Sequence, residues 1–244
     1  MIALLLTGRK GSVGFPGKHF CQVRGHELAY YPIKTAGKCE EIDVKYLSTN
    51  DDRLMQMAID NNIQVIKRPE YLCSSTAVSE DVLVHGYNYI RQKHGDIDIM
   101  VLLMCNAPCI TSEIISRGIK VLQDNPSYDS AVTVSSYNMW SPVRARKIGD
   151  DNLLHPFIPF EMLDDLDINY NSNRDTQGKV WFADMGVSIV RSRCIENIEN
   201  GILPQKWMGR KIYPLQQEMG LDVDYEWEIN QADKWLELYG EEEI

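Results

Sequence analysis

Two apolar runs without polar alternation limit the fold of this chain more than any other feature. They are Ile2–Leu6 and Ile97–Met104. Runs of this length and character are typical of strands buried on both faces of a parallel sheet. Helical segments and further strands alternate around them. We therefore expect an α/β fold with a mostly parallel sheet, helices on both faces and ligands at the carboxyl ends of the strands.

Apolar periodicity and capping residues place the other elements. Helices are expected at residues 28–38, from about 54 to 61, and at 79–93, 114–123 and 226–238; strands are expected at 42–48, 63–66, 130–135, 180–191 and 211–215. Ser79 and Thr111 are suited to cap two of these helices, because their hydroxyl groups accept a free backbone N–H. The regular alternation ends near residue 136.

Residues 137–173 interrupt this alternation. Prolines break the segment repeatedly, and its large apolar side chains follow neither a helical nor a strand period; they include Trp140, Phe157, Phe160 and Met162. Apolar side chains without a place in the main core are often covered by a second subunit. We expect one α/β domain from 1–136 and 174–244, with 137–173 as a projecting insertion that mediates a homodimer.

Composition disfavours several classes of function. The chain has 244 residues, 44% of them hydrophobic, and its 25 basic and 35 acidic residues give a formal charge of −10. This charge disfavours sequence-independent nucleic-acid binding, so an anionic ligand needs local cations or a metal ion. The 6 scattered cysteines, without a C-x-x-C pair, indicate reduced thiols. No secretory signal or transmembrane-length run is visible, which favours a cytoplasmic protein without a membrane partner.

A glycine-rich loop follows the first apolar run. It contains Gly8, Gly11, Gly14 and Gly17 together with the cations Arg9, Lys10 and Lys18. Glycines let a ligand approach backbone N–H groups, and with nearby cations they suit a polyphosphate. The spacing matches neither the G-x-x-x-x-G-K-[ST] phosphate loop nor the G-x-G-x-x-G dinucleotide motif. On composition alone, a flexible surface loop is an equally good interpretation.

Asp222 and Asp224 form a second candidate site near the carboxyl terminus. They are two residues apart at a predicted strand or strand end, so both carboxylates point to one side and could share a divalent cation. Such pairs also arise by chance in an acidic chain. The preceding Gly220, at an element boundary, and the need of a polyphosphate for Mg²⁺ favour the metal site.

Several arginines could contact an anionic ligand. Arg68 follows a short strand, Arg144 and Arg146 alternate beside His155, and Arg174 precedes a predicted buried strand. A carboxylate clamp and an ordinary solvated strand edge explain Arg144 and Arg146 equally well. Arg174 suits either a turn or a substrate contact. The histidines lie in dissimilar contexts, so no Ser/His/Asp or Cys/His set is indicated.

Taken in order, these motifs resemble the CMP-sialic acid synthetase family of cytidylyltransferases over nearly the whole chain. The most specific part is R-x-G-S-x-G-x-P-x-K at Arg9–Lys18; the others are Arg68-Pro69, Ser79-Glu80-Asp81, Asn106-Ala107-Pro108 and Asp222-Val223-Asp224. The stretches around the glycine loop, Trp140 and Asp222 look most similar to the bacterial branch that activates legionaminic-type nonulosonic acids.

This resemblance implies a Rossmann-like domain, a dimerisation segment, and transfer of CMP from CTP to an acidic nine-carbon sugar with release of pyrophosphate. Arg9, Ser12 and Lys18 would contact the triphosphate with the loop around Thr7, Gly8 and Gly11, and Arg68 and Ser79 would hold cytidine. Asp222 and Asp224 would hold Mg²⁺, and Asn106, Arg144, Arg146 and Arg174 would face the sugar. Arg9, Lys18 and Asp222 are the candidate catalytic residues, with Asp222 accepting the proton.

The chain departs from the family at four positions. Lys10 replaces a usual Gly and His19 replaces a usual Asn, and both changes affect the expected selection of cytosine. Met104 and Met185 replace polar residues. The two methionines make the expected sugar pocket more apolar and favour a deoxy or acylated sugar. The alternatives are a nucleotidyltransferase for a Kdo-type acid or with another NTP, a non-catalytic nucleotide-binding protein of the same fold, and an interaction protein built around 137–173.

Overall fold

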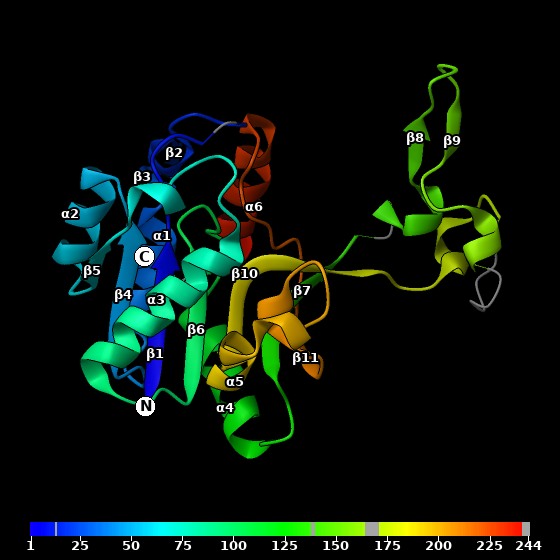
Figure 1. Cartoon of the computed structure of the whole chain (residues 1–244). Coiled ribbons are helices and arrows are strands. Elements are labelled where there is room, and N and C mark those ends of the chain that lie inside the picture. Colours follow the sequence, from blue (N-terminus) through cyan, green and yellow to red (C-terminus); the bar gives the residue numbers. More distant parts are fainter. Residues whose placement is uncertain (13, 138–139, 164–170, 241–244) are drawn as a thin grey trace.

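A seven-stranded sheet forms the centre of the chain in the computed structural model, which describes residues 1–12, 14–137, 140–163 and 171–240. The strand order is β11-β7-β10-β6-β1-β4-β5 (Figure 1). The strands are β1 (Ile2–Thr7), β4 (Val44–Thr49), β5 (Gln64–Lys67), β6 (Ile99–Met104), β7 (Ser130–Ser136), β10 (Trp181–Arg191) and β11 (Ile212–Gln217). Both apolar runs identified in the sequence form neighbouring central strands, β1 and β6.

The sheet is mostly parallel, as expected. Strand β1 pairs in parallel with β4 and β6, β4 with β5, and β7 with β11. Strand β10 is the exception, because it runs antiparallel between β6 and β7. The carboxyl ends of the parallel strands therefore meet at one edge of the sheet, and the first residues of β10 lie at that same edge.

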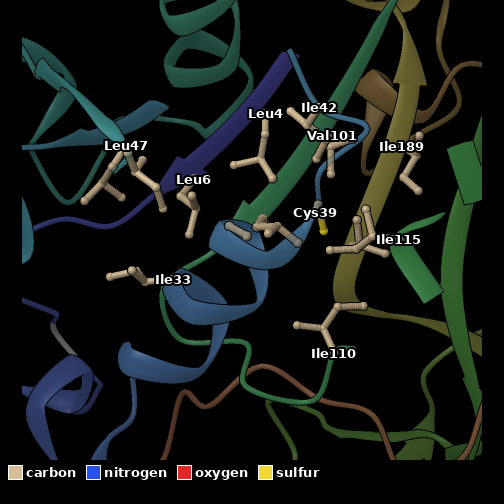
Figure 2. Close-up of a cluster of buried hydrophobic side chains, with 14 of the residues drawn as sticks. Leu4, Leu6, Ile33, Cys39, Ile42, Leu47, Val101, Ile110, Ile115 and Ile189 are labelled. Carbon is tan, nitrogen blue, oxygen red and sulfur yellow. The ribbon is translucent and has the colours of Figure 1, made fainter. Parts of the chain in front are cut away.

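Helices cover both faces of the sheet, which confirms the predicted layers. They are α1 (Tyr30–Lys38), α2 (Asp52–Asp60), α3 (Ser79–His94), α4 (Ser112–Asp124), α5 (Ser192–Glu196) and α6 (Ile229–Tyr239). Leu4 and Leu6 pack with α1, α2 and α4 in the cluster that Figure 2 shows. Ala3 and Leu5 point to the other face and pack against α3. Strand alternation thus explains why nearly every β1 side chain is apolar.

Caps account for two of the helix starts. The carboxylate of Asp51 accepts hydrogen bonds from the N–H groups of Arg53 and Leu54 at the start of α2. The hydroxyl of Thr111 accepts one from Ile114 N–H at the start of α4, as predicted. The prediction that Ser79 caps α3 is wrong: the extended residue before the helix is Val78, and Ser79 already belongs to the first turn. Its hydroxyl is therefore not used as a cap.

The predicted insertion leaves the sheet between the end of β7 and the start of β10. It contains a hairpin of β8 (Arg146–Ile148) and β9 (Leu154–Pro156), which projects away from the sheet (Figure 1). Leu154 and Met162 are 72% and 74% exposed, although both are apolar. Residues 138–139 and 164–170 of the predicted insertion, and the acidic end at 241–244, lie outside the described residues.

The smaller elements join these units. A short hairpin of β2 (Gln22–Val23) and β3 (His26–Glu27) follows the glycine loop and packs with α6. In the part of the chain that the structure describes, no helix is long and apolar enough to cross a membrane.

Candidate active site

A cavity of about 640 Å³ opens at the carboxyl edge of the sheet. Most of the residues that the sequence singled out line it, although they come from distant parts of the chain; they are Thr7, Gly8, Arg9, Ser12, Lys18, Arg68, Ser79, Asn106, Asp222 and Asp224. Gly11 does not line it and is exposed in the same loop. The position agrees with the rule that ligands bind outside the carboxyl ends of strands in open α/β sheets.

Lys18 joins the glycine loop to the pair of aspartates. Gly17 has φ 76°, a left-handed conformation that favours glycine, and the chain turns there into the short helix Lys18–Phe20. The Lys18 ammonium is buried and lies 2.5 Å from a carboxylate oxygen of Asp224. The loop and the aspartates therefore face one another across the same cavity.

Arg68 brings a buried positive charge to the cavity. Its guanidinium donates hydrogen bonds to the hydroxyl and the carbonyl oxygen of Ser48, and burial lowers its pKa. Arg9 donates to the carbonyl oxygen of Cys73. Among the described residues, neither arginine has a carboxylate within ion-pair distance. Cations held in this way are prepared for an anion that the protein does not supply.

The aspartates lie in an extended segment and not on a strand, so that part of the prediction is wrong. Strand β11 ends at Gln217, and the segment is held by Asn106 instead. The N–H of Val223 donates to the Asn106 carbonyl oxygen over 2.8 Å, and the Asn106 amide donates to the Val223 carbonyl oxygen over 3.1 Å. Because Val223 points into the core, Asp222 and Asp224 both face the cavity.

The two aspartates differ in their surroundings. Burial, and then the neighbouring charge of Asp224, raise the pKa of Asp222 to about 6. Asp224 is exposed and is neutralised in part by Lys18. The described residues contain no group of three or more His, Cys, Asp or Glu side chains arranged to hold a metal ion. A pair of carboxylates beside a phosphate site nevertheless fits Mg²⁺, which keeps several waters and uses one or two protein carboxylates.

His19 contributes a neutral imidazole to the cavity. Burial, together with the charges of Lys18 and Arg68, lowers its pKa to about 4. At neutral pH the ring is therefore uncharged and offers one donor and one acceptor.

Other lining residues were not identified from the sequence. Gln205 and Trp207 reach the cavity from the segment between α5 and β11, and Tyr225 follows directly after Asp224. Trp207 is buried and its indole N–H donates to the Ser188 hydroxyl. No spacing or composition signal marks residues 201–210, so only the fold identifies them. Met104 and Met185, noted as departures in the sequence, also line the cavity and contribute to its apolar surface.

The arginines of the insertion do not join this cavity within one chain. Arg144 and Arg146 line a separate cavity of about 200 Å³ and donate mainly to nearby oxygens, including those of Gln177 and Val143. Arg174 begins a short helix, Arg174–Gln177, directly after the insertion. The expectation that Arg144 and Arg146 share one site with Asn106 is therefore not met by a single subunit.

Comparison with known proteins places these features in a family context. A model of the family described as cytidylyltransferase matches residues 3–150. A 3-deoxy-manno-octulosonate cytidylyltransferase of Chlamydia trachomatis is 21% identical over 131 residues, which are 54% of this chain and 49% of the relative. N-acylneuraminate cytidylyltransferase A of Danio rerio is 21% identical over 149 residues, 61% of this chain and 34% of the relative. The chain thus spans about half the length or less of these curated relatives.

Solved structures resemble the whole chain in fold. A CMP:2-keto-3-deoxy-manno-octonic acid synthetase complexed with CTP superposes with a TM-score of 0.66 at 14% identity, covering 97% of this chain and 98% of that one. A 4-diphosphocytidyl-2C-methyl-D-erythritol synthase gives 0.63 at 11% identity, covering 96% and 99%. At such identities the likeness concerns the fold alone.

Proposed function

The chain belongs to the cytidylyltransferase family, and from this premise we propose that it transfers the cytidylyl group of CTP to an acid sugar and releases pyrophosphate. The observation that carries the proposal is the charge arrangement of the cavity. Arg9, Lys18 and Arg68 face it together with the carboxylates of Asp222 and Asp224. Cations for a triphosphate and carboxylates for a divalent cation are the components that phosphoryl transfer requires.

The glycine loop and its cations form the triphosphate side of this proposal. Arg9, Ser12 and Lys18 would contact the phosphates, with backbone N–H groups near Gly8 and Gly11 assisting. Arg68 and Ser79 would lie towards the nucleoside, where the hydroxyl of Ser79 and the neutral ring of His19 would supply hydrogen-bonding groups. These are the groups that a pyrimidine edge needs, because it presents both donors and acceptors.

Asp222 and Asp224 would hold Mg²⁺. When bound, the ion would neutralise phosphate charge and orient the leaving pyrophosphate. The protein's own part is positional: Lys18 and Arg9 offset the charge on the transferring group, and the cavity holds the sugar hydroxyl in line with the α-phosphorus. Asp222 faces the cavity and would accept the proton of that hydroxyl.

The proposed sugar is a nonulosonic acid of the legionaminic type. Met104 and Met185 support it, because an apolar wall suits an acylated or deoxygenated carbon better than a hydroxyl group. A Kdo-type acid is the second candidate, because relatives and a structural neighbour are named for that sugar. Asn106 is a weaker sugar ligand than the motif implies, since its amide already bonds to Val223.

We further propose that the active form is a homodimer in which the insertion of one subunit covers the other. The exposed apolar side chains of the insertion support this arrangement, because water contact with Leu154, Phe157 and Met162 is unfavourable. Arg144, Arg146 and Arg174 would then reach the sugar carboxylate from the partner's side or remain structural.

Pyrophosphate release decides between these possibilities. The purified chain is incubated with each of the four NTPs, with and without Mg²⁺, and with diacylated legionaminate, N-acetylneuraminate or Kdo. We expect release only with CTP and Mg²⁺, with kcat/KM about 10-fold or more higher for diacylated legionaminate than for N-acetylneuraminate, the range of a missing apolar contact. A preference for Kdo would select the second candidate, and no release with any pair would overturn the activity.

Met185→Asn is the matched variant for the sugar wall. Met185 has φ 61°, a conformation that Asn tolerates better than Met, so the substitution adds a polar group without a backbone cost. We expect it to move the preference towards N-acetylneuraminate while KM for CTP stays constant. An unchanged preference would contradict the assignment of this wall to the sugar.

A further inference from the structure

Strand β10 contains a bulge where it passes the cavity. The five-residue step from Ala183 to Ser188 faces a two-residue step from Val134 to Val132 on β7. Within the bulge, Met185 adopts φ 61°, which is unfavourable for a side chain other than glycine, asparagine or aspartate. Something in the surrounding structure must hold this conformation.

The carboxylate of Asp184 lies at the centre of the bulge. It is 5% exposed and accepts hydrogen bonds from Ser135 Oγ at 2.6 Å, Gln217 Nε2 at 2.9 Å and Gly186 N at 3.1 Å. The Gln217 amide also donates to the Cys109 carbonyl oxygen, so its orientation is set by two acceptors. All three groups around Asp184 are therefore donors, which suits a carboxylate and not an amide.

The same network reaches the segment that carries the aspartates. The N–H of Gly220 donates to Ser135 Oγ at 3.0 Å, and the Gly220 carbonyl oxygen accepts from the Tyr137 hydroxyl at 2.6 Å. A Cβ at residue 220 would lie 2.5 Å from an Asp184 oxygen, so a larger residue there would displace this carboxylate. Ser135 uses its proton for Asp184 and its lone pair for Gly220, and thus links them.

We propose that Asp184 is a positioning residue. It holds Met185 on one side of the cavity. Through Ser135 and Gly220 it also holds the segment that carries Asp222 on another side. The two cavity groups lie far apart in sequence, and the Asp184–Ser135 pair, together with the bond from Gln217, connects their backbones. The kinetic part of the inference rests on the proposed function, whereas the structural part does not.

Asp184→Asn tests the network with little change in size. The amide must turn an N–H₂ group towards a donor, so one link is lost. We expect amide hydrogen exchange of residues 219–224 to become at least about 10-fold faster and kcat/KM for the acid sugar to fall about 10- to 100-fold, the usual effect of removing a group that orients a ligand-binding residue. KM for CTP should change less, because Arg9 and Arg68 are held by Cys73 and Ser48 on other elements.

Asp129→Asn is the matched control. Asp129 is a carboxylate at the other end of β7, where it accepts from the N–H groups of Arg210 and Lys211 and from Arg193. We expect this variant to lower stability without changing exchange at 219–224 or the KM for sugar. Equal effects of the two variants on those readouts would reduce Asp184 to a structural role and overturn the proposal, as would unchanged exchange in Asp184→Asn.

Ser135→Ala is measured if Asp184→Asn does not fold. It removes the link to Gly220 but leaves two donors on Asp184, so exchange at 219–224 must still increase. Wild-type protein that transfers no cytidylyl group to any acid sugar would contradict the proposed function alone, because the exchange measurement still decides the role of Asp184.

Discussion

The cavity and the insertion both present arginines, yet they are organised in opposite ways. Arg68 is buried at the cavity, its guanidinium donates to the two oxygens of Ser48, and its charge faces the cavity. Arg144 and Arg146 bond to oxygens of their own segment, and the apolar side chains near them face water. One chain thus holds the side chains of the cavity in place, whereas the apolar side chains of the insertion stay exposed in the described part of the chain.

The difference follows from where each region lies relative to the core. The cavity forms at the edge of a sheet whose side chains are fully packed, so its loops are held by neighbouring strands and helices. The hairpin of β8 and β9 has two short strands, and an isolated two-stranded hairpin has little stability by itself. Three experiments test this contrast.

The largest effect is expected from Lys18→Met. It removes a buried cation that faces the aspartates, and we expect kcat/KM to fall about 100- to 1,000-fold, as for other preorganised electrostatic groups. Lys10→Met is the matched control: Lys10 belongs to the same loop, but it is exposed and does not line the cavity. Similar losses in pyrophosphate release for both variants would show that general loop charge, and not the cavity, matters.

A pH effect on stability is expected from His19. Its pKa of about 4 in the folded protein lies below the value of 6.5 in the unfolded chain, so the unfolded state binds more protons between these values. The contribution of the neutral ring is complete above pH 6.5 and is lost as the pH falls towards 4. The His19→Asn variant has no titrating group at this position. Urea unfolding at pH 7.5 and 4.5 measures how far the free energy of unfolding falls between the two values, and we expect this fall to be about 2 to 3 kcal/mol smaller in the variant than in the wild type. An equal fall in the free energy of unfolding in the wild type and the variant would show that the His19 ring is exposed to water in the folded protein.

The smallest effect, and the one that tests the other side of the contrast, is expected from Leu154→Glu. A charge on the exposed β9 side chain should weaken self-association about 10- to 30-fold, the order of a substantial interface contact, without lowering the free energy of unfolding of one subunit. Light scattering over a dilution series measures it. Ile59→Glu, on the exposed face of α2, is the control, since it is 58% exposed in the main domain. A wild-type monomer, or equal effects of both changes, would contradict the dimer.

Much of the fold could be predicted from local pattern. Ile2–Leu6 and Ile97–Met104 are apolar at every position or nearly so, because both faces of the central strands are covered. The glycine loop and the pair Asp222 and Asp224 were also visible, because each is a short motif with its own chemistry. Their common cavity was inferred only from the rule on strand ends and from the family resemblance.

Other features depend on contacts between distant residues. The direction of β10, its bulge at Met185 and the contribution of Trp207 are set by how β6, β7 and the segment after α5 pack together. Asn106 has a backbone partner in Val223, more than a hundred residues away, which no local pattern indicates. For the same reason Asp184, a lone acidic residue in an apolar strand, gave no signal.

The α/β alternation, the cationic glycine loop and the paired aspartates are properties of short stretches of sequence, since burial period and residue chemistry are local. The contact of Lys18 with Asp224, the raised pKa of Asp222 and the separation of Arg144 and Arg146 from the cavity depend on the packed chain. Distances, burial and charge coupling arise only when segments far apart in the chain pack together.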